Sequence, residues 1–294
     1  MVEIYQNCGQ QLGRQSCSAP LTLWQYLVVP AKLPLILLPP SEGKAAGGAG
    51  PAWCANNMAV PLETTRGLDA RTVVMKALSA AMARNAAQRG KLLGVKGAAL
   101  QSATEANRSL LLATTLPAID RYTGVLYEAI EIGSLAAAAQ RRMDRSVLIF
   151  SGLWGLLTPR DLIPDYKLKM GASLPRLGKL STWWRPLLSP QLAAHAQGRR
   201  VWNLLPIEHN AAWTAPPQVP QISVKFFERR QDGSLVAVSH WNKFLKGALV
   251  RHLLEHPDCS PSSLEHWDHP SGYVLNPSLT EQRESVTVLA FVQN

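Results

Sequence analysis

Two short segments contain most of the residues whose types suit binding or acid–base chemistry. The first, Pro39–Lys44, offers a hydroxyl on Ser41, a carboxylate on Glu42 and an ammonium on Lys44, directly after an aliphatic run. Loops at strand ends are the usual location of binding groups. Lys44 is suited to pair with a phosphate while Glu42 orients it or acts as a base. The alternative is a solvated turn with a surface ion pair, worth ~0–1 kcal/mol.

The second segment is Ser151–Gly171, which also follows an aliphatic run. It combines two acids, three bases and two aromatic residues with three glycines and two prolines. So many residues that restrict the backbone indicate a shaped loop. A structural loop with alternating surface charges is the alternative. Its candidate site residues are Arg160, Asp161, Tyr166, Lys167 and Lys169.

Three further places carry candidate phosphate-binding residues. Arg121 and Tyr122 set a cation beside an aromatic ring, as nucleic-acid sites often do. Lys243 and Lys246 lie one turn apart on an expected helix, where a solvated face is the alternative. Lys96 lies in a glycine-containing turn between two expected helices. There, backbone N–H groups and a helix N-terminus can hold a phosphate, although a plain connection has the same pattern.

Familiar catalytic and metal-binding motifs are missing. Gly43-Lys44 is followed by Ala45 and lacks the upstream glycine of a phosphate-binding P-loop. No G-x-S-x-G, H-E-x-x-H or G-x-G-x-x-G occurs. His252 and His256 have the spacing of zinc ligands on one helix face, but no standard finger spacing accompanies them. We therefore predict neither a metal nor a cofactor.

The chain is basic, with 30 Lys plus Arg against 20 Asp plus Glu, a net charge of +10 and a pI near 9.7. The excess is local, because residues 66–96 contain seven basic residues and one acid. Such a balance favours nucleic acid, nucleotides or another polyanion as partner. A generic solubilising surface is the alternative.

The apolar stretch Leu21–Pro40 raises the question of a membrane segment. It is interrupted by Gln25, Pro30, Lys32 and Pro34, whereas a membrane helix needs about 20 nearly uncharged residues. The basic start and cleavage site of a signal peptide are also missing. We therefore expect a cytoplasmic protein without a membrane partner.

The expected elements alternate between strands and helices. Aliphatic runs predict buried strands at 35–38, 147–150, 201–205 and 286–292, and a hairpin over 222–238 around Gln231-Asp232-Gly233. Apolar spacing predicts helices at 69–87, 98–112 and 240–255. No internal repeat or linker is present. The prediction is one α/β (mixed α+β) domain over residues 32–294, with a central mixed sheet, surrounding helices and a basic cleft. Residues 1–31 show no sustained period and are predicted to be a poorly ordered N-terminal extension.

Four blocks in this order resemble the YaaA family of peroxide stress proteins. They are PPSEGK at 39–44, RYTGVLYEAI at 121–130, SGLWGLLTPRDLIPDYKLKMG at 151–171 and SHWNKFLKGALVRHLLE at 239–255. The resemblance implies a compact mixed α/β fold with a positively charged cleft. It also implies binding of double-stranded DNA, assisted by a helix-hairpin-helix-like element at 91–97, and a role against peroxide damage linked to lower free iron. Residues that match the family by position are Lys44, Arg121, Tyr122, Gly124, Asp161, Tyr166, Lys169, Lys243 and Lys246.

Three hypotheses follow. The first is a monomeric stress protein that binds double-stranded or structured DNA in a basic cleft. The second is an enzyme acting on a nucleotide or nucleobase in the same cleft, with Glu42, Lys44 and Asp161 as candidate catalytic residues. The third is a protein that binds a protein partner through its tryptophans. The sequence leaves open whether catalysis occurs.

Overall fold

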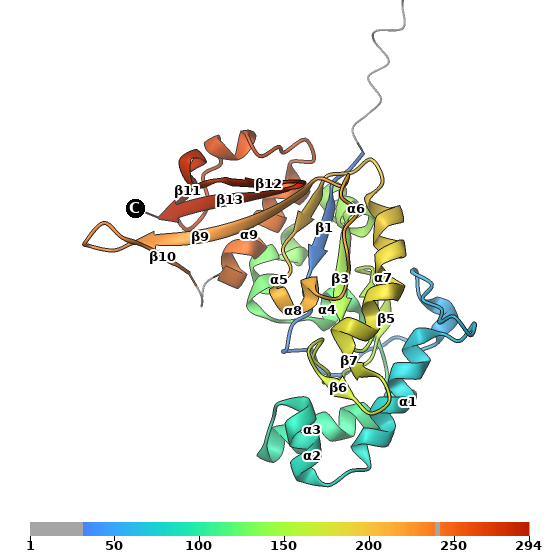
Figure 1. Ribbon diagram of the computed structural model, residues 1–294. Coiled ribbons are helices and arrows are strands. Elements are labelled where there is room, and N and C mark those ends of the chain that lie inside the picture. Colours follow the sequence, from blue (N-terminus) through green and yellow to red (C-terminus); the bar gives the residue numbers. More distant parts are fainter. Residues whose placement is uncertain (1–31, 239–241, 294) are drawn as a thin grey trace, which may run out of the picture. The chain divides into compact units, whose positions relative to one another are not determined.

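Among the described residues, a nine-stranded mixed sheet forms the centre of the protein (Figure 1). Seven of its strands lie in the order β11-β13-β9-β8-β1-β3-β4, while β10 pairs with β9 and β12 pairs with β13. The computed structural model describes residues 32–238 and 242–293. The strands of this sheet are β1 (Leu35–Leu38), β3 (Val147–Ser151), β4 (Gly155–Leu157), β8 (Val201–Asn203), β9 (Gln221–Arg229), β10 (Leu235–Ala237), β11 (Tyr273–Leu275), β12 (Glu281–Arg283) and β13 (Val286–Gln293). The pairs β2 (Leu116–Pro117) with β5 (Leu162–Ile163), and β6 (Ser173–Leu174) with β7 (Gly178–Lys179), lie outside it.

Helices surround the sheet. They are α1 (Ala70–Met82), α2 (Ala86–Leu93), α3 (Gly97–Arg108), α4 (Ala118–Arg121), α5 (Val125–Ile130), α6 (Ala137–Ser146), α7 (Leu180–Ala196), α8 (Ile207–Asn210) and α9 (Asn242–Glu255). Helices α1–α3 lie together at the lower end in Figure 1. The mixed α/β fold with a central mixed sheet and surrounding helices is thus confirmed.

Parallel pairing in the middle of the sheet brings three strand ends to one edge. Strand β1 pairs in parallel with β3 on one side and with β8 on the other. All four residues of β1 are at most 1% exposed, as expected for a strand covered on both faces. Pro39 and Pro40 then stop the ladder because they have no N–H group. The loops after β1, β3 and β8 therefore leave the sheet side by side.

The predicted hairpin is also observed. Strands β9 and β10 pair antiparallel, and Arg230 N–H donates to the carbonyl of Ser234 across the turn at 2.9 Å. The closing strand β13 pairs in parallel with β9 along its whole length.

The helix predicted over 69–87 is wrong in its extent. Asp69 caps α1 by accepting from Thr72 N–H at 2.8 Å, and α1 ends at Met82. A second helix starts behind Asn85, whose side chain accepts from Gln88 N–H at 3.0 Å. The capping side chain of Asn85, inside one run of good helix formers, thus divides this run into two helices. The predicted extension at 1–31 lies outside the described residues, and that domain boundary stays a prediction.

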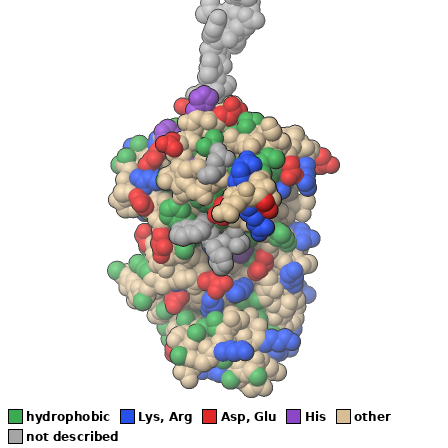
Figure 2. Space-filling model, turned by 90° about the vertical axis from the view of Figure 1, so that its left-hand side faces the viewer, with side chains coloured by type: hydrophobic (Ala, Val, Ile, Leu, Met, Phe, Trp, Pro, Cys, Tyr) green, Lys and Arg blue, Asp and Glu red, His purple; other side chains and the backbone are tan. Residues whose placement is uncertain are grey.

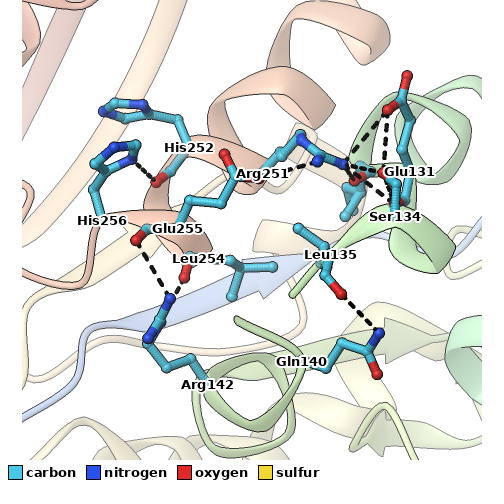
Figure 3. A network of polar contacts seen from close by, with 11 residues as sticks. Glu131, Ser134, Leu135, Gln140, Arg142, Arg251, His252, Leu254, Glu255 and His256 are labelled. Atoms are coloured by element: carbon cyan, nitrogen blue, oxygen red, sulfur yellow. Dashed lines mark hydrogen bonds and ion pairs between the residues drawn. The ribbon is translucent and has the colours of Figure 1, made fainter. Parts of the chain in front are cut away.

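Helix α9 is held to the rest of the protein by an arginine network (Figure 3). Arg251 donates to the carbonyl of Ile130 at 3.0 Å and to Oγ of Ser134 at 2.8 Å, and pairs with Glu255 at 3.0 Å. Gly247 lets α9 approach α5 closely, because a Cβ there would lie 2.3 Å from the carbonyl oxygen of Leu126. This docking sets the position of the first turn of α9. Within the described parts of the chain, no helix is long and apolar enough to cross a membrane.

Candidate functional site

A cleft of about 160 Å³ opens where the loops after β1 and β8 meet the segment that follows β5. The first turn of α9 closes one side. Most of its lining residues are polar or charged, and they come from four parts of the chain that are far apart in sequence. The lining residues are Pro39, Pro40, Ser41, Glu42, Lys44, Tyr166, Lys167, Leu168, Lys169, Pro206, Glu208, His209 and Lys243.

The loop at 39–44 is held tightly against α4 and α5. Tyr127 donates its hydroxyl to the carbonyl of Pro39 at 2.7 Å. Gly124 is needed for the close approach, since a Cβ there would lie only 2.7 Å from Cβ of Ser41. Lys44 forms a β-bridge with Tyr122, and Ala45 N–H donates to the carbonyl of Arg121 at 2.8 Å. The backbone around Lys44 is therefore held against the end of α4.

The amine of Lys44 is partly buried against aromatic rings. Its Nζ lies 4.4 Å from the ring centre of Tyr166 and donates to the carbonyl of Ser41 at 3.3 Å. No carboxylate of the described residues lies within ion-pair distance of it. Burial lowers the pKa of Lys44 to about 8, and the charge of Asp165 opposes this change. A neutral amine is thus accessible near physiological pH.

Below Lys44, three hydroxyl groups form a hydrogen-bonded chain. The hydroxyl of Tyr166 lies 2.7 Å from that of Tyr122 and 2.7 Å from that of Ser151. Ser151 in turn accepts from Trp154 N–H at 3.1 Å. Burial raises the pKa of Tyr166 to about 12, so these groups stay neutral. The chain ties α4, the end of β3 and the 166–169 segment into one rigid floor.

Glu42 bridges two lysines at the mouth of the cleft. Lys167 and Lys169 each place Nζ 3.0 Å from one of its carboxylate oxygens. The hydrogen bond from Lys167, followed by that from Lys169, lowers the pKa of Glu42 to about 2. Because Glu42 is exposed, this pairing contributes little to stability. It does orient both ammonium groups.

The 167–169 segment is positioned from two sides. Asn107 of α3 accepts from Lys167 N–H and donates to the carbonyl of Lys167, both at 2.9 Å. On the other side, a Cβ at Gly152 would lie 2.7 Å from the carbonyl oxygen of Leu168. The carbonyl of Gly152 accepts from the indole of Trp184 at 3.0 Å. The predicted loop Ser151–Gly171 thus folds back on itself and packs against α3.

The sequence analysis did not name Glu208 and His209, which also line the cleft. Both ring nitrogens of His209 are buried, and no described residue donates to or accepts from them. Burial lowers the pKa of His209 to about 4, and the charge of Lys243 acts in the same direction. The imidazole is therefore neutral at pH 7. The sequence did offer one sign that these two residues belong to the site. They follow the strand predicted at 201–205, whose end lies at the same sheet edge as Pro39.

Seven of the predicted site residues meet in this cleft, and six do not line it. The seven are Ser41, Glu42, Lys44, Tyr166, Lys167, Lys169 and Lys243. Tyr122 lies beneath Lys44, in the hydroxyl chain. Lys246 donates to the carbonyl of Leu204 at 3.2 Å. Lys96 is exposed before α3, and Arg160 is paired with Asp144 at 2.8 Å.

Arg121 and Asp161 are buried and have a structural role, because their side chains bind backbone groups of neighbouring loops. Arg121 is 0% exposed and donates to the carbonyls of Gly47 at 2.8 Å and Ile163 at 3.2 Å. Asp161 is 3% exposed and accepts from the N–H groups of Ala59 at 2.8 Å and Thr158 at 2.6 Å. Neither side chain is open to a ligand. Both hold loops, as buried ionic groups with several backbone partners do.

No group of three or more His, Cys, Asp or Glu side chains suited to a metal ion occurs among residues 32–238 and 242–293. His252 and His256 stack on each other with ring centres 4.2 Å apart, and His252 also stacks on Trp267 at 4.7 Å.

Fold and site together define a mixed α/β protein with a lysine-lined cleft at the carboxyl ends of its parallel strands. The family model described as "Peroxide stress protein YaaA" matches residues 35–279. The chain belongs to this family, and membership supports a role in the oxidative stress response.

Curated relatives carry the name UPF0246 protein. One from Streptomyces coelicolor is 39% identical over 220 residues, which cover 75% of this chain and 82% of the relative. One from Corynebacterium glutamicum is 33% identical and covers 74% of this chain and 83% of its own length. One from Corynebacterium efficiens is 31% identical over 260 residues, which cover 87% of this chain and 99% of the relative.

Proposed function

We propose that this protein acts in the cytoplasm under peroxide stress by binding double-stranded or structured DNA in the lysine-lined cleft. The observation that carries the proposal is the meeting of Lys44, Lys167, Lys169 and Lys243 in one cleft. Glu42 and Glu208 are the acids in the same lining, so the cleft keeps a positive balance. Ammonium groups of this kind neutralise phosphates and release counterions.

The turn between α2 and α3 supports a second contact with the same strand. Gly94 ends α2 with φ of 69°, and a Cβ there would lie 3.7 Å from Nζ of Lys169. The turn therefore borders the cleft. The free N–H groups of α3 begin at Gly97, next to Lys96. Lys and Arg side chains also occur together on the lower part of the face in Figure 2, at the end where Figure 1 shows α2 and α3.

We expect little preference for sequence. The cleft offers lysines, and within its described lining there is no arginine, asparagine or glutamine to read base edges. Lysines contact phosphates as point charges, which positions a duplex without reading it. Preference should therefore follow the shape of the DNA.

A salt titration tests the proposal. The affinity for duplex and junction DNA is measured by fluorescence anisotropy at several salt concentrations. The logarithm of affinity should fall by about 0.9 per logarithmic unit of salt for each phosphate contacted. Lys167→Ala and Lys243→Ala should each lower that slope by about one contact, whereas Lys179→Ala, which removes an exposed lysine outside the cleft, should not. Undetectable binding at low salt would refute the proposal.

A second candidate function, an enzyme acting on a nucleotide or nucleobase, is favoured by Lys44 and His209. A buried amine with no carboxylate partner among the described residues, together with a neutral imidazole, is more than phosphate contact requires. If Lys44→Ala keeps its DNA affinity but loses protection of cells against peroxide, the enzyme is supported. If the variant only loses one phosphate contact, the binding protein is supported.

A further inference from the structure

Lys44 differs chemically from its neighbours in the cleft. Lys167 and Lys169 each pair with Glu42 at 3.0 Å, so both have a carboxylate partner at the mouth. Lys44 lies deeper, against the ring of Tyr166, and its closest polar partner is the carbonyl of Ser41 at 3.3 Å. Its burial makes the neutral amine accessible near pH 8. A neutral primary amine is a nucleophile toward carbonyl carbon.

His209 provides a second reactive group in the same lining. Both of its ring nitrogens are buried without a partner among the described residues. Because it stays neutral at pH 7, one ring nitrogen has a free lone pair. A neutral imidazole that lines the same cleft as a nucleophilic amine is suited to accept a proton from a bound substrate.

The surrounding charges define what kind of carbonyl compound fits. Lys167, Lys169 and Lys243 line the same cleft as Lys44 and suit phosphates that neighbour the reacting atom. An aldehyde flanked by two phosphates occurs in DNA where a deoxyribose has lost its base and opened its ring. We propose that Lys44 forms an imine with the C1′ aldehyde of such an abasic site and cleaves the strand by elimination. This inference rests on the proposed DNA binding in the cleft.

The steps balance without an oxidant or reductant. Nζ of Lys44 attacks C1′, the C1′–O bond breaks, and water leaves as the C=N bond forms. His209 then takes the proton from C2′, and the electron pair of that C–H bond forms a C2′–C3′ double bond. The C3′–O bond breaks, and the 3′ phosphate departs with its electron pair. Water finally hydrolyses the imine, which restores the amine of Lys44 and releases an unsaturated aldehyde.

Trapping with borohydride tests the imine directly. The full chain is incubated with a labelled duplex that contains one abasic site, and sodium borohydride reduces any imine to a stable amine. The expected result is a covalent protein–DNA adduct whose peptide map places the sugar remnant on Lys44. Lys44→Ala should lower the trapped fraction by roughly 100-fold. Lys179→Ala, on an exposed lysine outside the cleft, should trap like the wild type.

Binding is measured in parallel on a duplex that carries a tetrahydrofuran analogue, which has no aldehyde. Tight binding to this duplex without any trapped adduct would overturn the inference and leave the proposed function standing. Loss of binding to every DNA tested would overturn both this inference and the proposed DNA-binding function. An adduct that forms equally well with Lys44→Ala, with its fold verified by circular dichroism, would overturn the assignment to Lys44.

His209→Gln separates the two chemical steps. Trapping needs only the amine, so it should persist, whereas strand cleavage without borohydride should slow by about 100-fold or more. Cleavage at the wild-type rate, or a parallel loss of trapping and cleavage, would overturn the role of His209 as the base.

Discussion

Replacing Lys44 by methionine is expected to stabilise the fold at neutral pH. Burial lowers the pKa of Lys44 from 10.5 to about 8, which means that the folded protein disfavours the charged amine. At pH 7 this corresponds to about 3 kcal/mol of lost stability. Methionine removes that penalty and keeps a long apolar side chain against the ring of Tyr166.

The gain is reduced by the hydrogen bond that methionine cannot make. Lys44 donates to the carbonyl of Ser41 at 3.3 Å, and its loss costs about 1 kcal/mol. The net expectation at pH 7 is therefore an increase of about 2 kcal/mol in the free energy of unfolding. A residue that costs this much stability is typical of a functional site.

The pH dependence gives the prediction its specificity. Below pH 8 the amine is charged in both the folded and the unfolded state, so the wild type has the full penalty. Between pH 8 and 10.5 the folded amine is neutral while the unfolded one still binds its proton. Wild-type stability therefore rises with pH relative to Lys44→Met. The advantage of the variant should shrink by about 2 kcal/mol between pH 7 and pH 9.5.

Urea unfolding of both proteins at pH 7 and pH 9.5 measures this difference. Lys179→Met is the matched control, because Lys179 is exposed, and its effect should be small at both values. A Lys44→Met protein that is less stable than the wild type at pH 7 would refute the reasoning. So would a difference that does not change with pH.

Three further changes test the positioning of the cleft. Gly152→Ala should destabilise the fold by about 2 kcal/mol or more, measured by urea unfolding, because its Cβ would lie 2.7 Å from a backbone carbonyl oxygen. An unchanged midpoint would contradict that packing. Tyr166→Phe removes the hydroxyl between Tyr122 and Ser151 and should lower the free energy of unfolding by about 1–3 kcal/mol, measured by thermal unfolding. An unchanged stability would show that the three hydrogen-bonded hydroxyl groups do not stabilise the fold. Glu42→Gln removes the carboxylate partner of Lys167 and Lys169, so DNA affinity should rise and depend more steeply on salt in anisotropy titrations. Weaker binding would show that Glu42 is needed to position the two lysines.

Much of the fold followed from local sequence. The aliphatic runs at 35–38 and 147–150 became β1 and β3, and the turn at 231–233 became the β9–β10 hairpin. The boundary near 82–86 was missed, because alanine-rich sequence is helical on either side. Only the capping side chain of Asn85 marks the second start.

The sequence by itself determined that Lys44 and the loop at 151–171 follow buried strands and carry charges suited to an anionic partner. Strand ends, prolines and glycines act locally, so their consequences can be read along the chain. Tertiary structure alone decided which charges are available. It buried Arg121 and Asp161 among backbone groups, paired Glu42 with two lysines and brought His209 to the cleft. Burial and ion pairing depend on what packs against a side chain, and here the partners lie far away along the chain.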